Sequence, residues 1–273
     1  MRIWSLAAIG FMMAGSGMLF AADPAVGANS LSQSRIDEII QKFAAKEAAF
    51  AKARENYTYR QTAEVEALDP SGGVLGKWEI VSDIIFDPTG NRTEHVIYAP
   101  VSTLGDYLIL TPEDMQDLKS VQPFVLTTSE LPQYLIRYLG HQQVDEIGCY
   151  VFAVKPKKME GDQRYFEGEV WVDDQELQIV KTYGRGVGNA VKQGQRFPKF
   201  ETYRQQIDGK FWFPTYTIAN DTLHFKDTDQ RIKEIVRYEN YKQFKSSSTI
   251  TFGDAVDGTQ NPDQNKNQSQ PKK

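Results

Sequence analysis

The sequence predicts an α+β fold that is mainly β, in which helices cover one antiparallel sheet. Three observations predict it. The hydrophobic period changes from about 3.6 residues to 2 at Asn56, where a helix gives way to strands. Short turns rich in Asp, Pro and Gly then separate successive alternating segments, which is typical of an antiparallel meander. The 13 Tyr and 15 Phe residues favour strand-rich packing.

The first residues have the layout of an export signal. Arg2 precedes an apolar run from Ile3 to Phe20, and the small residues Ala21 and Ala22 follow. Several glycines interrupt the run, which is short for a helix that crosses a bilayer. We therefore expect a signal peptide over residues 1–22, cleaved near Ala21 or Ala22, with a retained membrane anchor as the alternative.

The mature chain is expected to form one domain over residues 34–245. A polar spacer, residues 23–33, precedes it, and the tail 246–273 is so polar that it should be disordered. Because Cys149 is the one cysteine, no intramolecular disulfide can form and a hydrophobic core must stabilise the domain. The formal net charge of −5 argues against nucleic acid as a partner, since such binding needs a concentrated positive surface.

The first expected element is a helix over residues 34–54. Ser34 precedes Asp37 by three residues, which approximates a capping box. Apolar residues then recur at helical spacing from Ile36 to Phe50, so one face of the helix should lie across the sheet.

Alternating or apolar segments bounded by turns predict the strands. They are residues 57–67, 77–86, 92–98, 148–156, 167–172, 177–183, 196–207, 210–219 and 231–244. Asp208-Gly209 between two of these segments is a strong two-residue hairpin signal. Residues 100–140 indicate an insertion of helices, with a helix start at Thr111-Pro112-Glu113-Asp114 and a short amphipathic helix over residues 131–139.

No catalytic or metal-binding pattern is found in the sequence. His95, His141 and His224 lie far apart without a second ligand at metal-like spacing, so we expect structural or surface roles. No Gly-x-Ser-x-Gly motif occurs, and no sequence feature gives Cys149 a basic partner, so it is expected in the core. The sequence therefore predicts a non-enzymatic protein with no catalytic residues, metal or cofactor.

Two further patterns have ordinary structural interpretations. The glycine-rich run 184–188 lacks the full spacing of a dinucleotide-binding loop, and no Walker lysine follows, so it predicts a flexible strand connection. The acid pairs Asp173-Asp174 and Asp227/Asp229 fall at predicted hairpin tips, where Asp suits the turn geometry. Calcium is not indicated, because Ile232 stands where an EF-hand loop needs glycine.

Apolar and aromatic residues on the predicted strands form the candidate ligand-binding set. They are Trp78, Ile80, Ile84, Phe86, Val170, Val172, Phe211 and Phe213. Two interpretations remain open. Either these side chains fill a packed core between sheet and helix, or the sheet curves and leaves an apolar cavity that holds an acyl chain.

The order of elements and three segments resemble the LolA-like superfamily. The segments are Val170-Trp171-Val172-Asp173, Ile179-Val180-Lys181 and RFPKFETYRQQIDGKFWFPTYT, residues 196–217. The last is similar to the strand, Asp-Gly hairpin and strand of outer-membrane lipoprotein-sorting-like proteins. The superfamily includes periplasmic lipoprotein carriers, RseB-type envelope-stress regulators and mycobacterial lipid-binding lipoproteins. The resemblance covers residues 57–244.

The resemblance implies a strongly curved, unclosed half-barrel sheet around helices, a hydrophobic cavity for acyl chains and no catalytic residues. It also implies a periplasmic location and transient membrane contact. The expected partners are the acyl chains of a lipid or lipoprotein. The alternative is a regulatory or interaction module that binds another envelope protein. In the carriers an arginine on a strand helps govern lid opening, and Arg60, Arg204 or neither corresponds to it.

Overall fold

The computed structural model describes residues 31–87, 89–189 and 196–244. The predicted signal peptide, the predicted disordered tail and most of the predicted spacer lie outside the described residues. No helix in the described ranges is long and apolar enough to cross a membrane.

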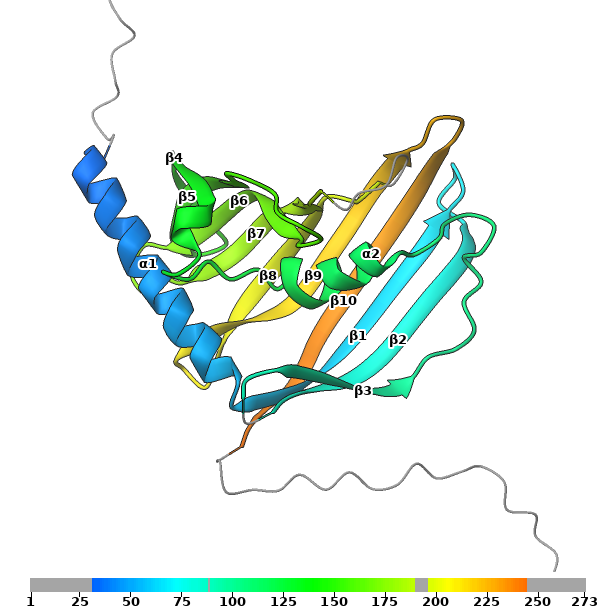
Figure 1. Cartoon of the computed structure of the whole chain (residues 1–273), viewed down its shortest axis with the longest axis horizontal. Coiled ribbons are helices and arrows are strands. Elements are labelled where there is room, and N and C mark those ends of the chain that lie inside the picture. The colour runs from blue at the N-terminus through cyan, green and yellow to red at the C-terminus, as the bar shows by residue number, and fades with distance from the viewer. Residues whose placement is uncertain (1–30, 88, 190–195, 245–273) are drawn as a thin grey trace, which may run out of the picture.

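One antiparallel sheet organises the described part of the chain. Its strands are β1 Tyr57–Leu68, β2 Val74–Phe86, β3 Arg92–Tyr98, β4 Tyr134–Val144, β5 Ile147–Pro156, β6 Tyr165–Asp173, β7 Ile179–Val187, β8 Phe200–Ile207, β9 Phe211–His224 and β10 Asp229–Gln243. Their order in the sheet is β3-β2-β1-β10-β9-β8-β7-β6-β5-β4. The sheet is strongly curved, and its edge strands β3 and β4 lie apart (Figure 1). The predicted mainly β, curved and unclosed fold class is confirmed.

Helix α1, Gln33–Arg54, packs against one half of this sheet (Figure 1). Ile39, Phe43 and Ala44 are buried in a cluster that includes Phe152 on β5. The predicted cap at Ser34 is wrong by two residues, because the side chain of Ser32 accepts a hydrogen bond from the Arg35 N–H and the helix begins earlier.

The second helix follows the predicted start at Thr111. Helix α2, Pro112–Gln116, begins with a capping box between Thr111 and Asp114. A π-helical turn, η1, continues it over Asp117–Val121. Both lie in front of β9 and β10 in Figure 1, on the concave side of the sheet. Residues 105–121 therefore form a wall opposite the strands.

The helix predicted over residues 131–139 is wrong. A short 3-10 helix covers Leu131–Gln133, and β4 then begins at Tyr134. Burial alternates along the first half of β4, which pairs with β5 from Tyr134 opposite Pro156 to Val144 opposite Ile147. The segment had apolar residues compatible with either period, and pairing with β5 determines the outcome.

Two other predictions need correction at the strand ends. Strand β8 begins at Phe200 rather than residue 196, and Pro198 has no N–H to give to a ladder. The glycine run 184–188 is not a connection, because β7 continues to Val187. By contrast, Asp208 and Gly209 have φ values of 55° and 63°, as a two-residue hairpin turn requires.

Candidate functional site: an apolar pocket with an acidic end

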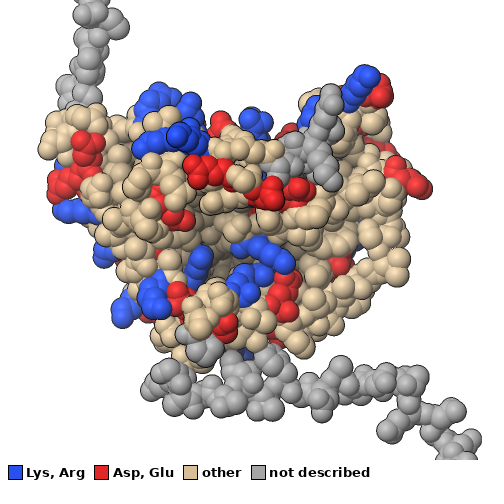
Figure 2. Space-filling view, in the orientation of Figure 1, with Lys and Arg blue, Asp and Glu red and all other residues tan. Residues whose placement is uncertain are grey.

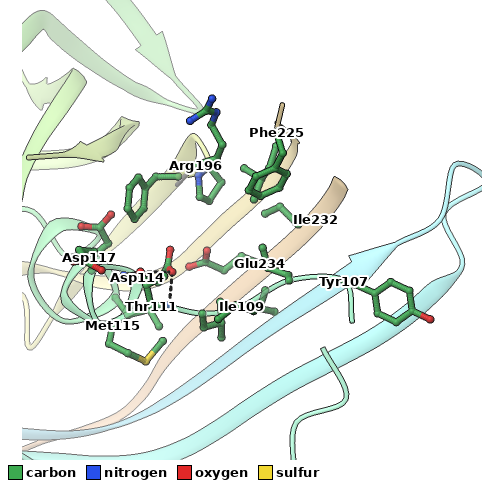
Figure 3. Close-up of a pocket in the computed structure, with 18 of the residues that line it drawn as sticks. Tyr107, Ile109, Thr111, Asp114, Met115, Asp117, Arg196, Phe225, Ile232 and Glu234 are labelled. Carbon is green, nitrogen blue, oxygen red and sulfur yellow. Dashed lines mark hydrogen bonds between the residues drawn. The ribbon is translucent and has the colours of Figure 1, made fainter. Parts of the chain in front are cut away.

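A pocket of about 750 Å³ lies between residues 105–118 and the concave side of the sheet (Figure 3). Strands β1, β8, β9 and β10 supply its inner wall through Val65, Phe200, Leu223 and Ile232. The size lies within the range of sites that take small molecules. The lining is mainly apolar, so the pocket suits a ligand with a hydrocarbon part.

Leu108 forms the middle of the outer wall. Its side chain is partly buried against the large core cluster and also against the cluster around Val65 and Leu104. The neighbouring Ile109 lines the same pocket but leaves 77% of its surface exposed. Hydrocarbon surface therefore runs from the pocket interior to the solvent.

Three carboxyl groups line one end of the pocket. Asp114 comes from α2, Asp117 from η1 and Glu234 from β10. Figure 3 shows Asp114 and Glu234 pointing toward one another. Glu234 faces inward because it lies two residues from both Ile232 and Val236, which are buried on the same face of β10.

Asp117 is held by a buried arginine. The Nε and Nη2 atoms of Arg164 donate to its two carboxylate oxygens at 2.8 and 2.5 Å. The guanidinium also lies 3.9 Å from the ring centroid of Phe197. Burial raises the pKa of Asp117 to about 6, although the Arg164 hydrogen bonds and charge act in the opposite direction.

Asp114 is fixed by the helix cap. Its carboxylate accepts hydrogen bonds from the backbone N–H and the hydroxyl of Thr111, at 2.7 and 2.8 Å. Burial raises the pKa of this carboxyl as well, against those hydrogen bonds and the charge of Arg164.

Glu234 accepts fewer hydrogen bonds than Asp114 and Asp117 do. Among the described residues it accepts one hydrogen bond, from the side-chain amide of Gln122. Burial raises the pKa of Glu234 to about 7, and the charges of Asp114 and Asp117 add to the effect. The Oε1 atom of Gln122 is buried without a hydrogen-bond partner in the described chain. Gln122 and Glu234 both line the pocket, so this end of it presents hydrogen-bond acceptors.

The eight residues predicted to bind the ligand lie elsewhere. Trp78 and Ile80 line a separate hollow of about 380 Å³, and Phe86 and Phe213 line another of about 540 Å³. The others are core or near-core residues: Ile84, Val170 and Val172 are buried, and Phe211 is half-buried beside Phe50. Their role in ligand binding stays a prediction.

Sequence reasoning missed Gln122, Asp117 and Glu234. One signal was present, since Glu234 is a charged residue at an inward position of an alternating strand. Gln122 gave no signal, because its partner is 112 residues away.

The other polar residues singled out from the sequence do not gather at a second site. The ring nitrogens of His141 and His224 lie 2.7 and 2.9 Å from carboxylates of Asp174 and Asp229. Cys149 is buried, and burial raises the pKa of its thiol to about 11. No group of three or more His, Cys, Asp or Glu in the part of the chain described could hold a metal ion.

The two candidate arginines have different surroundings. Arg60 lies near the surface and pairs with Asp83 at 2.9 Å. Arg204 is buried, pairs with Glu47 of α1 at 3.1 Å and also donates to the carbonyl of Phe124. Arg204 is therefore the one that joins α1 and the segment after η1 to the sheet.

The fold and the pocket together define an unclosed antiparallel half-barrel that holds a mainly apolar cavity against short helices. No protein-family model matches the chain, nor does any curated protein.

Solved structures similar to the chain include a LolA superfamily protein from Nitrosomonas europaea, at 11% identity and a TM-score of 0.34, covering 73% of this chain and 94% of that one. A putative outer membrane lipoprotein-sorting protein domain from Vibrio parahaemolyticus has 9% identity, a TM-score of 0.34 and coverages of 77% and 95%. The MucA/MucB complex from Pseudomonas aeruginosa gives 13% identity, a TM-score of 0.21 and coverages of 74% and 100%. The first carries the name of the superfamily that the sequence resembles.

Proposed function

We propose that this protein is a non-enzymatic periplasmic binding protein that holds the acyl chain of a lipid or lipoprotein. The observation that carries the proposal is the pocket of about 750 Å³ between residues 105–118 and the sheet, with its mainly apolar walls. The export signal expected from the sequence supports the location.

The shape of the wall supports a chain-like ligand. Residues 105–111 belong to the segment that joins β3 to α2, have no helix or strand of their own, and cover the strands from one side only. An acyl chain in the pocket would contact Leu108, Leu223 and Ile232 and would cover exposed apolar surface near Ile109. That burial is the main source of affinity for a hydrocarbon.

A filling variant tests the proposal. Leu108→Trp adds a large side chain to the outer wall, and we expect it to abolish or strongly weaken uptake of a fluorescent fatty acid by the purified mature protein. Val101→Trp is the matched control, because Val101 is 93% exposed and is not among the pocket-lining residues. Equal uptake by the two variants would contradict the proposal.

A second candidate function, an envelope regulatory or interaction module, rests on strand β3. It is an edge strand whose Val96, Ile97 and Tyr98 leave about half of their surface exposed. An open edge can pair with a strand of another protein. Native mass spectrometry of the protein isolated from its own cells separates the candidates: copurified lipid supports the first, and one stoichiometric protein partner without lipid supports the second.

A further inference from the structure

The carboxyl groups at one end of the pocket indicate the chemistry of the ligand's polar end. Charged residues in or beside the pocket are Glu113, Asp114, Asp117, Arg164, Arg196, Lys226, Asp227 and Glu234. Of the cations, Arg164 is held by Asp117, and Lys226 is exposed. Arg196 is also exposed, points away from the labelled carboxyl groups and donates to the carbonyl of His224 (Figure 3). Arg164 is therefore the one buried cation among these residues, and its hydrogen bonds go to Asp117 rather than to Asp114 or Glu234.

Gln122 is the second observation that points to a ligand. Its side chain is buried, with 2% of the residue exposed, and its Oε1 has no donor in the described chain. A buried acceptor without a partner costs about 1–3 kcal/mol. Gln122 uses its amide N–H on Glu234, so an amide oxygen and a carboxyl group lie next to each other at the pocket wall. A ligand group with several N–H donors would satisfy both.

We infer that the pocket binds an amphiphile whose apolar chain ends in a primary ammonium group, with the ammonium held by Glu234 and the Oε1 of Gln122. This rests on the proposed function, because the same pocket takes the chain. An ammonium carries three donors and no acceptor, which matches two acceptors side by side. Its charge also offsets the excess of carboxyls over guanidinium at this end.

The pH dependence follows from the carboxyl. Because burial raises the pKa of Glu234 to about 7, a larger fraction of it is ionised at about pH 8 than at about pH 6. Ammonium binding should therefore strengthen as the pH rises across this range. Asp117, whose pKa is about 6, titrates in the same direction.

Calorimetric titration of the mature protein with three probes of equal chain length tests the inference: dodecylammonium, dodecanol and dodecanoate, each below its micelle concentration. At about pH 8 we expect dodecylammonium to bind about tenfold or more tightly than dodecanol, as a charge-assisted hydrogen bond implies. Glu234→Gln should remove this preference. Glu239→Gln, an exposed acid on the same strand, is the control and should keep the preference.

The outcomes separate the two proposals. If all three probes bind equally, or if Glu234→Gln keeps the ammonium preference, the inference falls and the acyl-chain function stands. If none of the probes binds, the proposed function falls and the inference with it. Two further probes, both lysophospholipids, then identify the source of the ammonium. Tighter binding of lysophosphatidylethanolamine than of lysophosphatidylglycerol supports an ethanolamine lipid. If these two bind equally and dodecylammonium still binds more tightly than dodecanol, a free amine is supported.

Discussion

At the scale of single residues, the buried carboxyl of Glu234 lowers the stability of the folded protein near neutral pH. The carboxyl is buried on β10 with one amide partner in the described chain. Burial raises its folded-state pKa from 4.5 to about 7. The folded protein therefore holds a proton that the unfolded chain loses above about pH 4.5, and stability falls as the pH rises from there to about 7.

Replacing Glu234 tests this directly. Glu234→Gln keeps the shape and removes the titration, so the free energy of unfolding should decrease less between about pH 4.5 and pH 7 than in the unmodified protein. The shift corresponds to about 3 kcal/mol, as an order of magnitude. Urea unfolding followed by tryptophan fluorescence at several pH values measures it. Identical pH profiles for the two proteins would contradict the assignment of a raised pKa.

Local chemistry was predictable at this scale, and long-range pairing was not. The turn residues Asp208 and Gly209 and the Thr111 cap act within a few residues of themselves, so their sequence neighbours determine what they do. Gln122 and Arg164 instead act on Glu234 and Asp117, from which they are far away in the sequence. The acidic end of the pocket therefore cannot be predicted from local sequence, because the folded sheet brings its residues together.

At the scale of elements, the close contact between β7 and η1 positions the site. Gly186 lies at a buried position of β7, directly against the carboxyl group of Asp117. A side chain at this position would overlap that carboxyl, which Arg164 holds in place. The sequence predicts a flexible connection here. Instead, the lack of a side chain at Gly186 lets η1 lie close against β7.

Gly186→Ala should therefore disturb η1. The added methyl group would displace Asp117 from Arg164, and we expect a loss of about 1–3 kcal/mol in the free energy of unfolding, as for other overpacked sites. Weaker ligand uptake should accompany it, because η1 forms part of the pocket wall. Gly105→Ala is the control, since a methyl group there would meet open space. Equal urea midpoints for the two variants would show that η1 tolerates the methyl group.

The errors in predicting elements have a common physical cause. Residues 131–139 carry apolar side chains that fit a helix, yet Tyr134, Ile136 and Tyr138 also alternate and complete the edge of the sheet beside β5. Tertiary pairing overrides local preference in such a segment. A strand that follows a clear turn, such as β3 at Arg92–Tyr98, was predicted with its observed ends.

At the scale of the whole molecule, one buried ion pair joins three parts of the fold. Glu47 lies on α1, Arg204 on β8, and Arg204 also donates to the carbonyl of Phe124 in the segment after η1. The backbone N–H of Ile179 on β7 donates to Glu47 at 3.1 Å. Burial raises the pKa of Glu47, and the charge of Arg204 opposes that rise. The curvature of the sheet was implied by family resemblance, whereas this pair could not be found from sequence.

The pair should behave as a unit when it is broken. Arg204→Met leaves Glu47 buried without its counter-charge, so we expect a loss of about 3–5 kcal/mol in the free energy of unfolding. The double variant Glu47→Leu with Arg204→Met removes both charges and should recover most of that loss, because an apolar pair of similar volume often replaces a buried ion pair without cost. Urea unfolding of the single and double variants measures the coupling. If the losses of the two single variants simply add in the double variant, Glu47 and Arg204 do not stabilise the fold as a pair.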